Sequence, residues 1–95
     1  MTKKENGLFV LYELIKTLKH RVESDDPVRK ENIKVAKERA KASAMTLFYL
    51  QLLSINERDV IDSYINGLVE GTLTEELRLK TFNIFEDMIK ESEVQ

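Results

Sequence analysis

The chain has 95 residues, of which 42% are hydrophobic and 34% charged, and its formal net charge is −2 at pH 7. This length corresponds to one domain, because chains divide at about 100–200 residues per domain. The absence of cysteine excludes disulfide scaffolds, thiolate zinc sites and thiol nucleophiles, and three glycines with one proline are too few for a β protein with many turns.

Helical spacing of the apolar residues predicts four helices, over residues 3–22, 27–53, 57–70 and 75–91. Thr2 with Glu5 three positions later fits a capping box at the start of the first helix. Asp26 is the expected N-cap of the second helix and Pro27 its first residue. No glycine or proline interrupts residues 28–53, so this helix is expected to be about 40 Å long.

The last two helices have their own start and stop signals. Asn56 is the predicted N-cap of the third helix, and Ser54 with Glu57 forms a competing capping box. Gly71 is a natural stop for that helix, and Thr74 is the predicted cap of the fourth. Short loops favour antiparallel neighbours, so the predicted fold class is all-α: an antiparallel four-helix bundle-like domain over residues 1–95 with one long second helix.

The apolar faces of these helices indicate self-association. The first, third and fourth helices carry apolar arcs of roughly 160–180°, wider than the ~100° stripe that one neighbour covers. A single bundle of this size has difficulty hiding all of that surface, so we expect a two-fold dimer; a kink near Ser43 that closes the monomer on itself is the alternative. The residues predicted to mediate self-association are Ala36, Ala40, Ala44, Met45, Phe48 and Leu52.

Charge is distributed unevenly along the chain. Residues 27–54 hold six basic and two acidic side chains, whereas residues 55–95 hold four basic and ten acidic ones. Four lysines at helical spacing, the lysine strip, are the predicted partner-binding residues: Lys30, Lys34, Lys37 and Lys41. The strip indicates docking to an acidic protein or to phosphate backbone, and a solvated helix face is the simpler interpretation. The sequence pI of about 5.5 favours a protein partner over nucleic acid.

Catalytic chemistry is not indicated anywhere in the chain. The single histidine, His20, falls on the polar side of the first helix, without a serine, cysteine or second histidine placed to complete a nucleophile–base pair. The acidic cluster at 23–26 lacks the spacing of a calcium loop and is better explained by helix capping. We therefore predict no enzyme, no metal site and no cofactor.

The sequence favours a small non-enzymatic helical protein that binds another protein as an adaptor, inhibitor or regulator. The alternative is a dimeric nucleic-acid accessory protein that uses two lysine strips. In length, charge and helical architecture the chain also resembles bacteriocin immunity proteins, an analogy that rests on no shared motif. Neither the N-terminal segment nor the apolar run 44–53 has the pattern of a membrane anchor or signal peptide, so a cytoplasmic protein is expected.

Overall fold

Four helices make up the fold in the computed structural model, which describes residues 2–24 and 29–94, with side chains over residues 2–24 and 30–85. They are α1 (Lys3–Glu23), α2 (Arg29–Tyr49), α3 (Ile55–Glu70) and α4 (Glu75–Val94). The described residues contain no strand, so the all-α prediction is confirmed. The predicted cap and first residue of the second helix, Asp26 and Pro27, lie outside the described residues.

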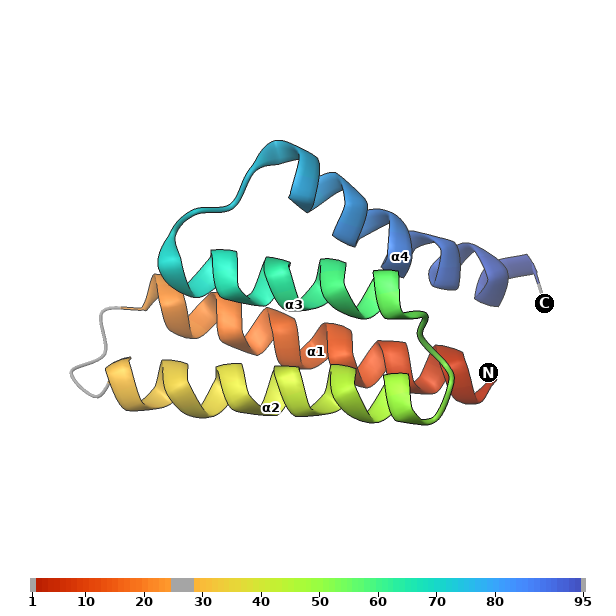
Figure 1. The fold of residues 1–95 in the computed structure, drawn as a ribbon, viewed down its shortest axis with the longest axis horizontal. Helices are drawn as coiled ribbons and strands as arrows, with labels where there is room; N and C mark the ends of the chain where they lie inside the picture. The colour runs from red at the N-terminus through yellow and green to blue at the C-terminus, as the bar shows by residue number, and fades with distance from the viewer. Residues whose placement is uncertain (1, 25–28, 95) are drawn as a thin grey trace.

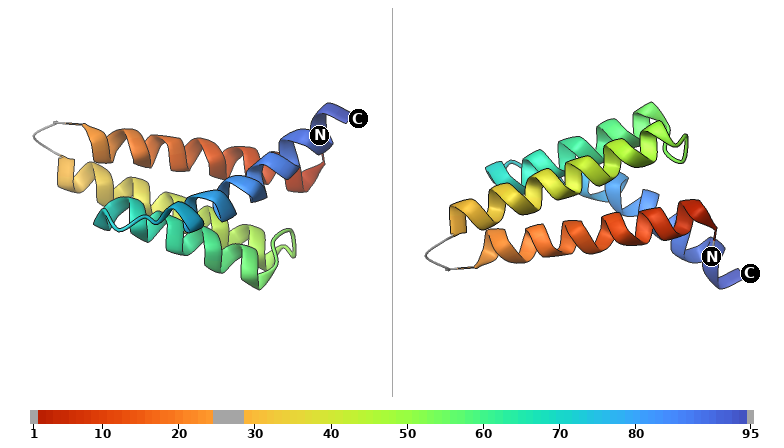
Figure 2. Two further views of the ribbon diagram at one scale, coloured as in Figure 1. Left: turned by 90° about the horizontal axis from the view of Figure 1, so that it is seen from above. Right: turned by 90° about the horizontal axis from the view of Figure 1, so that it is seen from below.

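Three of the helices lie side by side, and the fourth crosses them. In Figure 1, α1, α2 and α3 follow the long axis of the molecule, and α4 begins apart from them and approaches α1 along its length. Figure 2 shows the same oblique crossing from above and below. The molecule measures 43 × 24 × 24 Å along its principal axes. The aligned up-down arrangement expected from the short loops therefore does not extend to α4.

The helix starts follow from local hydrogen bonds. The Glu5 N–H donates to Thr2 Oγ1 at 3.1 Å, and the Leu77 N–H donates to Thr74 Oγ1 at 3.1 Å, so both predicted caps are confirmed. The predicted Asn56 cap is wrong, because the competing capping box forms instead. The Glu57 N–H donates to Ser54 Oγ at 3.1 Å, and the Glu57 carboxylate accepts from the Ser54 N–H at 2.9 Å. Such a box satisfies two donors at the exposed helix end.

The second helix ends at Tyr49, so its predicted extension to residue 53 is wrong. Gln51 adopts the left-handed conformation with φ of 62°. Its N–H donates to the Phe48 carbonyl, and the Leu52 N–H donates to the Leu47 carbonyl, both at 2.9 Å. This hydrogen-bond pattern is the Schellman motif, which normally has glycine at the left-handed position. Because glutamine occupies this position, the sequence gives no signal that the helix ends here.

Replacing Gln51 with glycine is expected to raise the free energy of unfolding by about 0.5–1 kcal/mol, because glycine adopts a positive φ without a steric penalty. Gln51 is exposed and its side chain makes no hydrogen bond among the described residues, so the substitution removes strain and little else. Urea unfolding would measure the change. Gln51→Ala is the matched control, and an equal gain for both variants would contradict the strain argument.

The core lies between α1, α2 and α3, with α4 contributing Phe85. Small residues on α2 let α1 approach closely, and Gly7 of α1 lies directly beside the Leu47 side chain. The buried apolar residues are Leu8, Leu11, Ile15, Leu18, Ala36, Ala40, Ala44, Leu47, Leu53, Ile61, Ile65, Leu68 and Phe85. The stripe of small residues on α2 therefore serves the packing of a single chain.

Candidate protein-docking surface

The three alanines of the predicted self-association face are inside the molecule. Ala36, Ala40 and Ala44 are 7%, 0% and 3% exposed, because they face the neighbouring helices of their own chain. A second copy has no access to them in this fold. They are therefore removed from the candidate docking surface, which retains Met45, Phe48 and Leu52.

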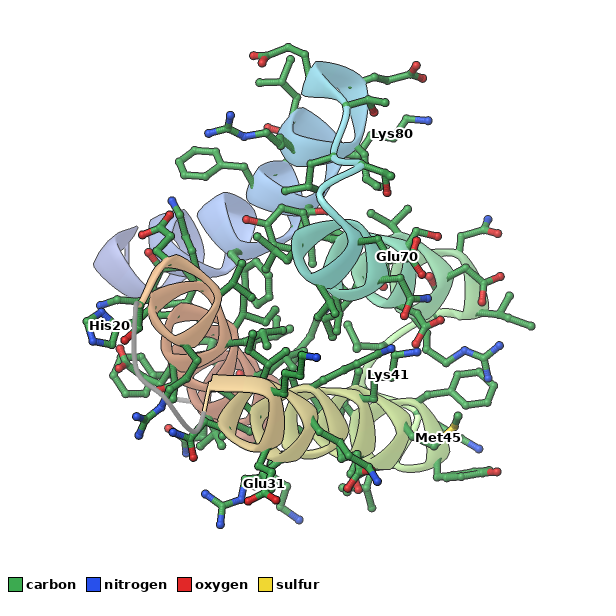
Figure 3. The ribbon with its side chains drawn as sticks, turned by 90° about the vertical axis from the view of Figure 1, so that its left-hand side faces the viewer. His20, Glu31, Lys41, Met45, Glu70 and Lys80 are labelled. Carbon is green, nitrogen blue, oxygen red and sulfur yellow. The ribbon has the colours of Figure 1, made fainter. Side chains whose placement is uncertain are left out.

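The lysine strip is divided by its surroundings. Lys30 and Lys34 are exposed, whereas Lys37 and Lys41 are half-buried. Lys41 Nζ lies 3.5 Å from the Asp62 carboxylate of α3, and Figure 3 shows Lys41 pointing from α2 toward α3. The acidic α3 thus neutralises one end of the strip. Its use by an acidic protein or by nucleic acid stays a prediction, with Lys30 and Lys34 as the accessible part.

A group of apolar side chains lies at the turn between α2 and α3. We call it the turn patch, and it consists of Met45, Phe48, Tyr49, Leu50, Leu52 and Ile55. Tyr49, Leu50 and Ile55 are 74%, 61% and 56% exposed, and Met45 is exposed as well. Phe48 and Leu52 are half-buried, and Leu52 packs against the core. The apolar run 45–53 is therefore covered on one side only.

Arg58 of α3 organises the base of the turn patch. Its guanidinium carbon lies 4.6 Å from the centroid of the Phe48 ring, its Nη1 lies 3.8 Å from Met45 Sδ, and its Nη2 lies 3.0 Å from the Asp59 carboxylate. The Phe48 and Tyr49 rings meet at 5.7 Å between centroids. These contacts hold an aromatic and cationic surface in one arrangement.

A shallow hollow, widely open to solvent, lies beside these rings. Its apolar lining includes Phe48, Tyr49 and Ile55, and Lys4 and Glu57 line it as well. The lining therefore combines one cation and one anion with apolar side chains. This is the composition of a protein interface, with an apolar core and a polar rim.

Other exposed side chains lie on α1 and α4. Phe9, Val10 and Leu79 are all about half exposed. His20 is exposed and lies on the outer side of α1 (Figure 3). Among the side chains that the structure describes, residues 2–24 and 30–85, no three histidine or acidic residues are grouped to hold a metal ion. None of the described helices is long and apolar enough to cross a membrane.

The sequence pattern does not indicate Tyr49, Leu50, Ile55 or Arg58 as docking residues. The apolar pattern continues the second helix through Tyr49 and Leu50 to residue 53, which conceals the exposure of these two side chains. Their exposure follows from the early end of α2 at Tyr49. Comparisons with known proteins found no matching family model, no similar curated protein and no similar solved structure.

Proposed function

We propose that this protein is a small, non-enzymatic helical docking protein that acts as an adaptor, inhibitor or regulator through its turn patch. The first partner of this surface is a second copy of the chain. The observation that carries the proposal is the gathering of Phe48, Tyr49, Leu50 and Ile55 around one exposed turn. The self-association of the protein in solution is therefore the property to measure.

The composition of the turn patch supports docking to a protein. Aromatic residues, methionine and arginine are the side chains enriched in interface cores, whereas lysine, glutamate and aspartate are depleted there. Tyrosine and arginine also dominate the binding energy of many interfaces. Tyr49 is the most exposed large apolar side chain among the described residues, and Arg58 is already held in place by Phe48 and Asp59. Little side-chain entropy is therefore lost at Arg58 on binding.

The charges around the turn patch favour a second copy as the occupant. A two-fold interface brings the same surface of both copies together, so a self-complementary surface needs both signs of charge. Lys4 and Glu57 lie at the same hollow, and a two-fold axis through it would bring Lys4 of each copy toward Glu57 of the other. A partner of uniformly acidic or basic surface would meet one unfavourable charge.

The self-association is expected to weaken at least tenfold in the variant Ile55→Glu. A charged side chain in the apolar centre of the turn patch would be desolvated without a partner on dimerisation. Glutamate is favoured in the first turn of a helix by the macrodipole, so α3 is expected to keep its fold. Sedimentation equilibrium over micromolar to millimolar protein would measure the dissociation constant, with circular dichroism as the test of folding.

Val35→Glu is the matched control for this experiment. Val35 is an exposed apolar residue of α2 at 47% accessibility, and it lies in the first half of that helix, away from the turn patch. Its replacement is expected to leave the association unchanged. A wild-type protein that stays monomeric at the highest concentration, or equal weakening by both variants, would overturn the proposal.

A further inference from the structure

A second hollow lies between α1 and the first half of α4, on a different part of the surface from the turn patch. Its volume is about 520 Å³, which falls within the ~300–1,000 Å³ range of small-molecule sites. The hollow lies where the two helices diverge. Figure 1 shows that α4 begins apart from the other helices and then approaches α1 obliquely. We call it the α1/α4 groove. Its described lining residues come from α1, α3 and α4.

The floor of the α1/α4 groove is apolar and aromatic. The Tyr12 and Phe85 rings meet there with 5.5 Å between centroids, and Ile15 lies beside them. On the α4 side, Leu79 and Phe82 line the groove and are more than half exposed. These side chains offer ring faces and edges to an apolar or aromatic ligand body.

Positive charge gathers around this apolar floor. Lys16 and Lys19 line the groove from α1 and Arg78 lines it from α4, against one carboxylate, Glu75. Lys16 lies 3.8 Å from the Glu13 carboxylate and 5.5 Å from the Tyr12 ring centroid. Within the described part of the chain, neither Lys19 nor Arg78 has an ion-pair partner. Such a concentration of cations in a chain of net charge −2 favours an anion in the groove.

A polar group without a partner lies on the same floor. Tyr64 of α3 is half-buried, and its hydroxyl makes no hydrogen bond to any described residue. Burial raises the pKa of Tyr64 above its ordinary value, and the positive charge of Arg78 acts in the opposite direction. The hydroxyl therefore stays protonated at neutral pH and lies within electrostatic reach of Arg78. A hydroxyl donor with a guanidinium is a suitable pair for holding a carboxylate.

We propose that the α1/α4 groove binds a small amphiphilic anion, with its apolar body against Tyr12, Phe82 and Phe85 and its anionic head toward Arg78, Lys19 and the Tyr64 hydroxyl. Cations from α1 and α4 converge here around one apolar floor, and a few convergent polar groups on an apolar lining are the arrangement of a small-molecule site. Carboxylates with an acyl or aryl body belong to this class. The site is independent of the turn patch and of the docking function proposed above.

Fluorescence titration with anilinonaphthalene sulfonate, an aromatic anion, tests the site. Binding is expected to weaken about tenfold in Arg78→Gln and in Lys19→Gln, because a charge-assisted hydrogen bond or a nearby charge is removed while the side-chain length is retained. Lys34→Gln removes one exposed cation from α2 and is expected to bind the probe as the wild type does. Both groove residues are exposed, so the variants are expected to keep their helicity by circular dichroism.

Competition distinguishes an anion site from a merely apolar one. Decanoate is expected to displace the probe at lower concentration than decanol, which has the same chain without the charge. The acyl and aryl classes are separated by comparing decanoate with naphthoate as competitors, and displacement by either supports the site. A probe that does not bind the wild type, equal affinity in Arg78→Gln and Lys34→Gln, or equal displacement by decanol would overturn the inference.

Discussion

Replacing Leu11 with alanine is expected to lower the free energy of unfolding by about 3 kcal/mol and the melting temperature by about 15 °C. Leu11 has no exposed surface and belongs to the core that α1, α2 and α3 share. The substitution removes buried methyl groups and leaves a cavity that the surrounding helices fill only in part. A small domain has about 5–15 kcal/mol of stability in total, so this single change would remove a large share. Urea and thermal unfolding measure both values.

Val35→Ala is the control, because it removes apolar atoms from an exposed position and leaves no cavity in the core. Val35 is about half exposed on α2, and its truncation is expected to change the stability by less than about 0.5 kcal/mol. If Leu11→Ala destabilised the protein no more than Val35→Ala, then Leu11 would not be buried in solution. The placement of α1 against α2 and α3 would then be wrong.

Most of the fold could be predicted because the helix signals are local. Thr2 and Thr74 accept hydrogen bonds from N–H groups in the first turns of α1 and α4, and Gly71 ends α3 in the left-handed conformation with φ of 72°. Each signal depends on residues within four positions of the helix end. Ser54 and Asn56 both fit the start of α3, and only the structure distinguishes the two.

The end of α2 could not be predicted for a physical reason. A Schellman motif is recognised in sequence by its glycine, and here Gln51 occupies the left-handed position. The residues around it, from Leu50 to Leu53, are apolar and continue the helical pattern. This one local conformation also determines the surface, because it turns Tyr49 and Leu50 out of the bundle. The helical spacing of apolar residues alone therefore does not predict the turn patch.

The α1/α4 groove was hidden for a different reason. Its cations come from Lys16 and Lys19 of α1 and Arg78 of α4, and its unpartnered hydroxyl comes from Tyr64 of α3. These residues are far apart in the sequence, and only the oblique crossing of α4 brings them together. Crossing angles depend on how the ridges of side chains on two helices fit, which a single sequence does not specify. The helical spacing of residues identifies a face of small or apolar side chains, but it does not identify the neighbouring helix that covers this face.

The stripe of alanines on α2 shows the same ambiguity, and one substitution resolves it. Ala40→Leu is expected to lower the free energy of unfolding by about 2 kcal/mol, because Ala40 is completely buried and a well-packed core has no room for three more carbon atoms. The loss should be the same at low and high protein concentration, since the crowding occurs within one chain. Urea unfolding at several protein concentrations measures it.

Ala42→Leu makes the same chemical change two residues further along α2, at an exposed position. Leucine and alanine have similar helix propensities, so this control is expected to stay within about 0.5 kcal/mol of the wild type. If the alanine stripe were instead the contact between two copies, Ala40→Leu would alter the dissociation constant and its effect on stability would grow with protein concentration. A concentration-independent loss that is confined to Ala40 places the stripe in the core of the single chain and leaves the turn patch as the surface for association.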